Sequence, residues 1–142
     1  MTISTILRGK GSEVVSIATG TRVTDVVQLL AQRRIGAVPV VDGDAVVGII
    51  SERDILYLLA AEGATALDRP VDAVMTAPAI TIEPELGILQ ALSLMTKRRI
   101  RHLPVVDASG MVGFVSIGDL VKARIDRIEE EAAALRDYIQ MA

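Results

Sequence analysis

The apolar positions along the chain alternate between two kinds of spacing, and each kind predicts an element. Short continuous runs rich in valine and isoleucine predict buried strands, whereas apolar residues three and four apart predict helices with one buried face. The expected strands are 14–17, 37–41 and 46–50 in the first half of the chain, and 79–82, 102–106 and 111–115 in the second. The first helix of each half is expected around Val23, Val26, Val27 and Leu30, and around Ile88, Leu92 and Met95. A second helix is expected after Ser51 and again after Ser116.

The two halves are copies of one unit at a constant offset of 65 residues. The Arg-Arg-Ile of residues 33–35 recurs at 98–100, and the Pro-Val-Val-Asp of 39–42 recurs at 104–107. A gapless repeat of this length indicates two copies of a β-α-β-β-α unit. We therefore expect an α/β (α+β) fold, in which two such motifs pack with pseudo-two-fold symmetry and form clefts between them.

Short amphipathic segments, 3–7 and 71–75, precede the two units. If Leu7 corresponds to Met75, the offset there becomes 68, so the first copy carries about three extra residues near Lys10, Gly11 and Ser12. Residues 62–70 are rich in Gly, Ala and Thr and are expected to form a linker. The predicted organisation is a first motif with its leading segment and linker over 1–70, a second motif over 71–122, and an extended C-terminal helix over 117–141.

The last helix is expected to continue to about Gln140, some four turns beyond its counterpart in the first copy. Its apolar residues are spaced 4, 3, 4, 3 and 4 apart, which is typical of a coiled-coil seam. They are Val121, Ile125, Ile128, Ala132, Leu135 and Ile139. The seam either packs on its own domain or meets a partner chain, and the extra length favours the partner chain.

Composition limits the possible partners. The 142 residues are 51% hydrophobic with a mean hydropathy of +0.45, yet no run of about 18 apolar residues predicts a membrane span. Buried strands and an oligomer interface explain the apolar excess. The net charge of −3 and the three aromatic residues argue against a nucleic-acid partner. The chain has no cysteine and no signal-peptide pattern, so we expect a cytoplasmic location.

One motif occurs in both copies at the junction of a strand and a helix. It reads Gly-φ-φ-Ser-x-x-Asp, with φ apolar, and covers residues 48–54 and 113–119. It is compatible with a simple helix cap, in which Ser and Asp exchange hydrogen bonds with the backbone. It is equally compatible with a ligand site, because a helix N-terminus attracts phosphate and a carboxylate can accept ribose hydroxyls. Two copies in register favour the ligand.

A basic run at residues 97–102 ends in Arg101 and His102, where the first copy has Gly36 and Ala37. Cations at the end of a helix need no functional reason, but these two residues open a strand, and an anion is the simplest explanation. His102 is the only histidine, so we expect no metal site and no Ser-His-Asp triad. Without a nucleophile–base pair or a phosphate-binding loop of the GxxxxGK type, we expect no enzyme activity and no catalytic cofactor.

These motifs resemble those of a tandem pair of CBS domains, the cystathionine-β-synthase-type unit also called a Bateman module. The chain looks closest to small stand-alone bacterial pairs. The resemblance implies adenosine-containing ligands (AMP, ADP, ATP, sometimes NAD or S-adenosylmethionine) in two clefts between the copies. It also implies a disc-shaped homodimer. A regulatory sensor is thus the leading hypothesis, and an adaptor or dimerisation module with vestigial clefts is the alternative.

The resemblance also implies two mixed sites. In the first site, Asp54 would hold the ribose, Ser51 would support the phosphate, and two cations of the other copy would meet it. Its residues are Ser51, Asp54, Thr81, Ile82, Arg101 and His102, with Ile80 beside Thr81 and Ile82 on the adenine strand. The second site would comprise Ser16, Ile17, Gly36, Ala37, Ser116 and Asp119. That site lacks the two cations, so we expect weaker binding, a less charged ligand, or a cation borrowed from Arg53 or Lys122.

Overall fold

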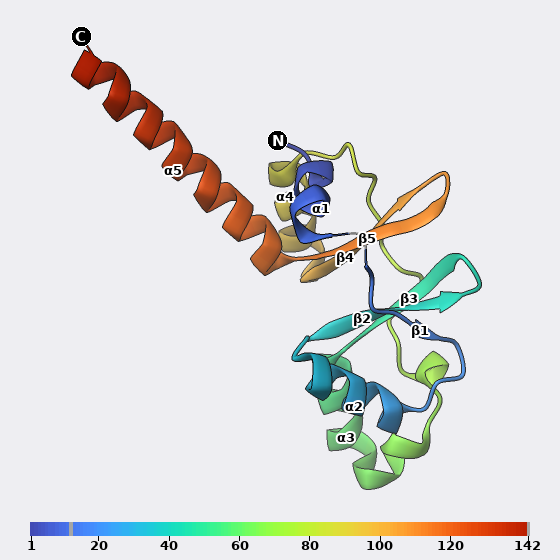
Figure 1. Cartoon of the computed structure of the whole chain (residues 1–142). Helices are drawn as coiled ribbons and strands as arrows, with labels where there is room; N and C mark the ends of the chain where they lie inside the picture. Colours follow the sequence, from blue (N-terminus) through green and yellow to red (C-terminus); the bar gives the residue numbers. More distant parts are fainter. Residues whose placement is uncertain (12, 142) are drawn as a thin grey trace.

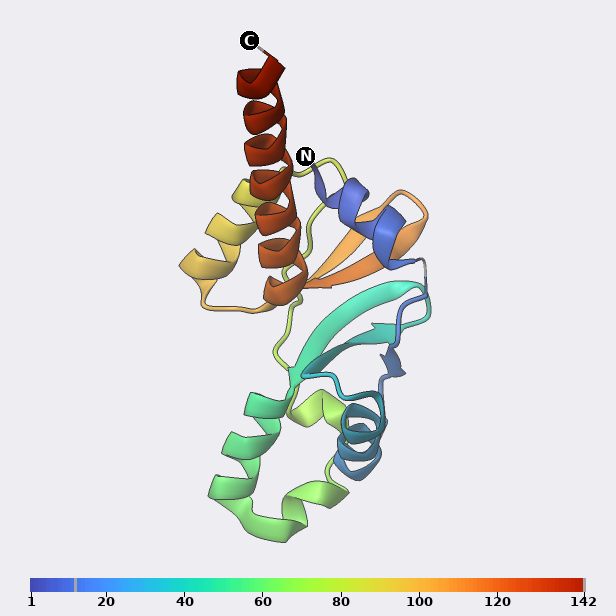
Figure 2. The ribbon, with the colours of Figure 1, turned by 60° about the vertical axis from the view of Figure 1, so that its left-hand side comes forward.

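The computed structural model describes residues 1–11 and 13–141, and each repeat forms its own small sheet with helices beside it (Figure 1). The first sheet has the order β1-β2-β3 and the second pairs β4 with β5. The first repeat comprises β1 (Ile17–Ala18), α2 (Val23–Arg33), β2 (Ala37–Asp42), β3 (Ala45–Ser51) and α3 (Glu52–Glu62). The second comprises α4 (Ile88–Arg98), β4 (His102–Asp107), β5 (Gly110–Ser116) and α5 (Ile117–Met141). The two hairpins meet in the middle of the molecule, with the helices of each repeat on its outer side (Figures 1 and 2).

Local geometry repeats as faithfully as the sequence does. Both hairpins are antiparallel and shift register at the same place, between Val40 and Val41 and between Val105 and Val106. Both first helices end on an arginine with positive φ: 52° at Arg34 and 54° at Arg99. The predicted hairpins and helices are therefore confirmed, and the offset of 65 holds in three dimensions.

The expected first strands are shorter than predicted. Only Ile17–Ala18 forms a strand, parallel to β2, and residues 79–82 contribute one bridge, between Ile82 and Val105. In the first copy the Thr19 amide extends the pairing by donating to the Val41 carbonyl at 3.1 Å. The corresponding residue in the second copy is Pro84, which has no N–H to donate. Pairing there ends at Ile82.

The leading segments cross over, so that each one packs on the other repeat. Helix α1 (Ile3–Lys10) buries Ile3 completely in the core of the second repeat, and the 3₁₀ helix η2 (Val71–Ala73) buries Val71 completely in the core of the first. Full burial of such a side chain contributes roughly 1.5–3 kcal/mol. Exchanging these segments ties the two repeats together and positions the residues that follow them.

The segment at 62–70 is more ordered than a linker. Residues Gly63–Asp68 form the 3₁₀ helix η1, in which Ala66 is completely buried. The Thr24 hydroxyl on α2 donates to the Leu67 carbonyl at 2.7 Å. Small side chains in this segment let its backbone pack closely against α2, and this packing replaces the expected open connection.

Helix α5 has the predicted length and leaves the body of the molecule soon after its first turns (Figures 1 and 2). Leu120 is buried and Ala123 packs against the second core, but the helix is largely exposed beyond them. Of the helices within residues 1–11 and 13–141, none combines the length and apolar character needed to cross a bilayer.

Candidate functional site: a cleft between the repeats and its counterpart

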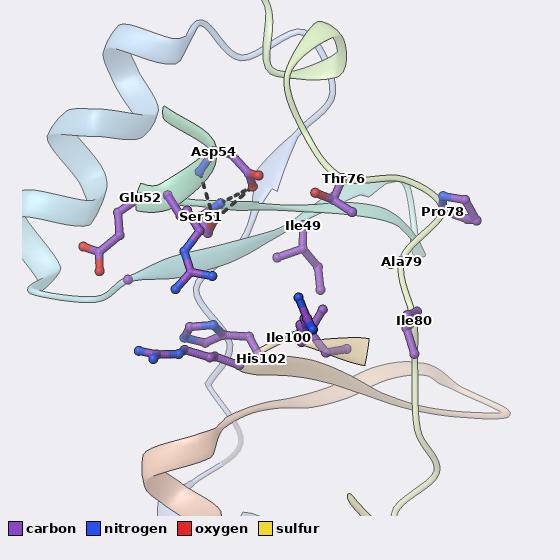
Figure 3. Close-up of a pocket in the computed structure, with 14 residues that line it drawn as sticks. Ile49, Ser51, Glu52, Asp54, Thr76, Pro78, Ala79, Ile80, Ile100 and His102 are labelled. Carbon is purple, nitrogen blue, oxygen red and sulfur yellow. Dashed lines mark hydrogen bonds between the residues drawn. The ribbon is translucent and has the colours of Figure 1, made fainter. Parts of the chain in front are cut away.

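A cavity of about 220 Å³ lies between the start of α3 and the start of β4, so both repeats line it (Figure 3). The first repeat contributes the start of α3 and the strand before it. The second contributes the end of α4, the start of β4 and the segment that follows η2. The lining residues are Gly36, Ile49, Ser51, Glu52, Arg53, Asp54, Thr76, Pro78, Ala79, Ile80, Arg99, Ile100, Arg101 and His102. We call this cavity the first cleft.

One wall of the first cleft is the N-terminus of α3. The Asp54 amide donates to Ser51 Oγ at 3.2 Å, and Asp54 Oδ2 accepts from the Ser51 amide at 2.9 Å and from Ser51 Oγ at 3.0 Å. The helix is thus reciprocally capped. The cap also fixes the Asp54 carboxylate at the mouth of the cavity. The Ser-x-x-Asp motif can therefore cap the helix and contribute to a ligand site at the same time.

A second wall, from the second repeat, carries Arg99, Arg101 and His102. Arg53 adds a cation to the α3 wall. The His102 ring stacks on Phe114, with centroids 5.5 Å apart and planes 12° apart. Burial, followed by the nearby Lys10 ammonium, lowers the pKa of His102 below its ordinary value.

The third wall is apolar and is fixed by backbone pairing. The Thr76 amide donates to the Ile49 carbonyl at 2.9 Å, and the Ile49 amide donates back to the Thr76 carbonyl at 3.0 Å. This pairing positions the segment from Thr76 to Ile80 along the cavity, facing Ile100. A flat apolar group could lie between these side chains with its polar edge against the backbone.

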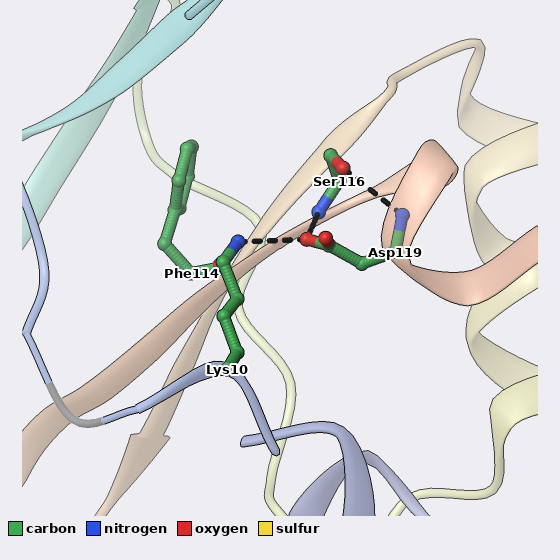
Figure 4. A network of polar contacts seen from close by, with 4 residues as sticks. All are labelled: Lys10, Phe114, Ser116 and Asp119. Atoms are coloured by element: carbon green, nitrogen blue, oxygen red, sulfur yellow. Dashed lines mark hydrogen bonds and ion pairs between the residues drawn. The ribbon is translucent and has the colours of Figure 1, made fainter. Parts of the chain in front are cut away.

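The corresponding region of the second repeat already contains a cation. Lys10 Nζ lies 2.7 Å from Asp119 Oδ2 and donates to the Phe114 carbonyl at 2.8 Å (Figure 4). The Ser116 amide donates to Asp119 Oδ2 at 2.8 Å, and the Asp119 amide donates to Ser116 Oγ at 3.1 Å. This region is the counterpart of the first cleft in the second repeat, and for that reason alone we call the surroundings of the Lys10–Asp119 pair the second cleft.

Charge and burial shift the pKa of Asp119 in opposite directions. Burial raises the pKa of its carboxyl group, but the hydrogen bonds from Lys10 and Ser116 and the Lys10 charge outweigh it, and the pKa falls below its ordinary value. Asp119 is therefore ionised at neutral pH and paired within its own chain. The Asp54 carboxylate, by contrast, is bonded to the backbone and side chain of Ser51.

The difference between the clefts follows from the extra residues of the first copy. Leu7 packs against Gly113 as Met75 packs against Gly48, so the predicted Leu7–Met75 equivalence is confirmed. One residue after Met75, the Thr76 amide reaches the Ile49 carbonyl. After Leu7 the helix continues to Lys10, whose side chain reaches the equivalent Phe114 carbonyl. Ser12, the last of the three residues named for the insertion, lies outside the described residues.

The family assignment rests on both repeats. The model of the CBS domain matches residues 11–61 and 71–126, which is most of the chain. The chain belongs to the CBS-domain family. It is 38% identical to the mitochondrial CBS domain-containing protein CBSX3 of Arabidopsis thaliana, over 98% of this chain and 72% of that protein. A CBS-domain protein of Agrobacterium tumefaciens superposes with a TM-score of 0.84 at 34% identity, over 87% of this chain and 99% of that one.

Two more distant CBS structures contain ligands. The CBS domain pair of protein MJ0100 is in complex with 5-methylthioadenosine and S-adenosyl-L-methionine, and it matches with a TM-score of 0.78 at 23% identity over 89% of this chain and 98% of that one. CBSX2 is in complex with AMP and matches with a TM-score of 0.71 at 23% identity over 80% of this chain and 90% of that one. At this identity the likeness establishes the shared fold. Both of these CBS proteins hold adenosine-containing molecules.

The CBS pair brings together four of the six residues expected in the first site. Ser51, Asp54, Arg101 and His102 all line the first cleft, together with Arg53. Two expected residues do not line it. Ile82 is almost completely buried in the core of the second repeat, and Thr81 lines a separate hollow with Glu83 and Asp107. The chain turns into the core at Ile82, so the apolar wall of the cleft lies earlier, from Thr76 to Ile80.

The residues expected in the second site are distributed differently. Ser116 and Asp119 lie together, but Gly36 lines the first cleft and Ala37 is buried in β2 opposite Ser51. Ile17 packs against the core of the first repeat and Ser16 is exposed.

The two cations considered for the second site lie elsewhere as well. Lys122 pairs with Asp126 along the exposed side of α5, and Arg53 lines the first cleft. The cation beside Asp119 is Lys10, which sequence reasoning missed.

Sequence reasoning also missed Glu52, Thr76 and Arg99 in the first cleft. Arg99 could have been found, because it belongs to the basic run already noted. Glu52 directly follows the capping Ser51. Its side chain lies close to Gly36, because an ideal Cβ atom placed on Gly36 would be 3.4 Å from Glu52 Oε1. Thr76 is positioned by an isolated backbone bridge that has no pattern in the sequence. Among the described residues, no group of three or more His, Cys, Asp or Glu side chains could hold a metal ion.

Proposed function

We propose that this CBS pair is a regulatory module without catalytic activity whose first cleft binds AMP, ADP, ATP or NAD. The observation that carries the proposal is the arrangement of polar groups around one cavity: a fixed carboxylate, Asp54, from the first repeat, and the cation Arg101, with His102 beside it, from the second. The apolar wall from Thr76 to Ile80 completes the lining. A nucleotide carries the three matching groups: an apolar base, a ribose and an anionic phosphate.

In this arrangement each wall has one role. Ile80 and Ile100 enclose the base, and exposed backbone groups of the Thr76–Ile80 segment give its polar edge partners. The Asp54 carboxylate accepts from the ribose hydroxyls, and Arg101 donates to the phosphate with His102 beside it. Charge-assisted bonds of this kind contribute roughly 1.5–3 kcal/mol each, equivalent to about ten- to a hundred-fold in affinity.

Regulation follows if the ligand binds one arrangement of the two repeats better than another. The cleft is well placed for this, because its walls come from both repeats and from the crossed-over segment after η2. We infer that nucleotide binding changes how the repeats pack and that a homodimer or a partner protein detects the change. The alternative is an adaptor whose clefts have lost their ligands.

Titration calorimetry of the purified chain with AMP, ADP, ATP, NAD and S-adenosylmethionine tests the proposal. We expect Arg101→Ala to weaken nucleotide binding by about ten- to a hundred-fold. Arg98→Ala is the matched control, because Arg98 is an exposed arginine of the same basic run that does not line the cavity. Unchanged affinity in Arg101→Ala would contradict the proposed phosphate site. If none of the five ligands binds to the chain, the adaptor is favoured.

The chain also offers a simple spectroscopic check. It has no tryptophan and two tyrosines, so it absorbs little at 280 nm. A co-purified adenine compound would dominate the ultraviolet spectrum, and heat release followed by mass measurement would identify it.

A further inference from the structure

Helix α5 carries, from Val121 to Ile139, an apolar seam that no other described part of this chain covers. Its larger members are all well exposed. The exposed fractions are 42% for Val121, 49% for Ile125, 49% for Ile128, 60% for Leu135 and 62% for Ile139. The ribbon shows the helix projecting away from both repeats (Figures 1 and 2). The alternative that the seam packs on its own domain is therefore wrong for the described residues.

A different stripe of α5 faces its own domain. Leu120 is buried, Ala123 packs against the second core, and Arg124, Arg127 and Glu131 line a hollow together with the start of α4. At 3.6 residues per turn, the seam lies about 100° around the helix from this stripe. A second helix can therefore lie along the seam without displacing α4.

We propose that α5 pairs with α5 of a second copy as a parallel, in-register, two-stranded coiled coil. The seam alternates between the two core positions of a heptad. One position holds Ile125, Ala132 and Ile139, and the other holds Val121, Ile128 and Leu135. Ile125 and Ile139 at the first position with Leu135 at the second form the combination typical of parallel two-stranded coiled coils. The proposal concerns the exposed face of α5 outside the first cleft and does not rest on nucleotide binding.

The flanking charges select the orientation. In a parallel pair, each residue on one flank of the seam meets the residue five positions later on the other chain. Arg124 then meets Glu129 of the partner subunit, and Glu131 meets Arg136 of the partner subunit. Symmetry doubles both pairs, so four attractive contacts form. Glu131 also accepts from Arg127 within its own helix at 2.9 Å, and a carboxylate can accept from both arginines.

An antiparallel pair along the whole seam would bring like charges together. With Val121 opposite Ile139 of the partner subunit, Glu129 would face Glu129 of the partner subunit and Glu131 would face Glu131 of the partner subunit. Lys122 would lie beside Arg136 of the partner subunit. Like-charge contacts of this kind disfavour the wrong arrangement.

Because the chain has no cysteine, a single introduced thiol reports the orientation directly. In the parallel arrangement the two Ile139→Cys thiols face each other, and we expect mild oxidation to give a disulfide-linked dimer. In the antiparallel arrangement they would be about 27 Å apart, beyond the reach of a disulfide, which needs Cα atoms within about 7 Å. Asp137→Cys is the matched control, because it places a thiol two residues away on the outer side of the same helix.

Three outcomes are decisive. Cross-linking of Ile139→Cys well above Asp137→Cys supports the proposal. Equal cross-linking of the two variants overturns it, as does cross-linking only in a mixture of Val121→Cys and Ile139→Cys chains, which indicates an antiparallel pair. As a second measurement, Arg124→Glu should raise the dimer dissociation constant about ten-fold, and adding Glu129→Arg should restore it. An unchanged dissociation constant in Arg124→Glu would contradict the proposed register.

Discussion

The two clefts are made by the same repeat, yet their aspartates have different partners. In the first cleft, the Asp54 carboxylate is bonded to Ser51 at the mouth of a cavity lined by cations from the other repeat. In the second cleft, Asp119 is paired with Lys10 of α1. The comparison teaches that a short insertion outside the motif can change a site while the motif itself stays intact.

The largest expected contrast concerns the two aspartates. Asp54→Asn keeps an oxygen that can accept from the Ser51 amide but removes the charge, and we expect about a ten-fold or greater loss of nucleotide affinity. Asp119→Asn makes the same chemical change in the second cleft and should alter affinity less than two-fold. Calorimetry on both variants checks this. Equal losses would mean that both clefts bind the nucleotide in the same way.

A second contrast uses the glycines that the crossed-over segments contact. A Cβ atom on Gly48 would lie 2.9 Å from the Thr76 carbonyl oxygen, which is backbone, and 2.7 Å from Met75 Sδ. A Cβ atom on Gly113 would meet only Leu7 side-chain carbons, the nearest at 2.4 Å. Overpacking costs about 1–3 kcal/mol.

We therefore expect both Gly48→Ala and Gly113→Ala to unfold at lower denaturant concentration. Only Gly48→Ala should also weaken nucleotide binding, because it displaces Thr76 from the wall of the first cleft. Chemical denaturation and calorimetry measure the two effects. Loss of nucleotide affinity in Gly113→Ala would show that the clefts are more tightly coupled than this contrast implies.

A smaller effect on stability, but a direct test of the second cleft, comes from Lys10. Lys10→Met removes the ammonium from Asp119, and we expect the free energy of unfolding to fall by no more than about 1 kcal/mol, because the pair is partly exposed. The open carboxylate should then accept ribose hydroxyls, so the binding stoichiometry should rise from one nucleotide per chain toward two. Arg8→Met is the control on the same helix. A stoichiometry that stays at one in Lys10→Met would show that Lys10 is not what closes this cleft.

The repeat made much of the fold predictable, since hydrophobic spacing and the offset of 65 located both hairpins and the four main helices. The first strand of the second repeat was overestimated, because Ala79 and Ile80 line the first cleft and only Ile82 pairs with β4, which a pattern of apolar residues does not register. The motif residues of the first cleft could be named because Ser51 and Asp54 recur in register. Thr76 and Lys10 could not, because their positions depend on segments that cross to the other repeat.

The smallest expected effect concerns pH and His102, which has no counterpart in the second cleft. Burial lowers the pKa of His102 in the free protein, so the ring is mostly neutral near pH 7. A bound phosphate favours the imidazolium and raises that pKa, so binding takes up a proton and affinity should increase as pH falls. Between pH 8 and pH 6.5 we expect a gain of about two-fold in AMP affinity that His102→Asn lacks. The sign is opposite for folding: since the folded pKa of His102 lies below the unfolded value, His102 contributes a loss of stability as pH falls through 6.5. Calorimetry in two buffers of different ionisation enthalpy measures the proton uptake, and equal uptake by the wild-type chain and His102→Asn would place the phosphate away from this ring.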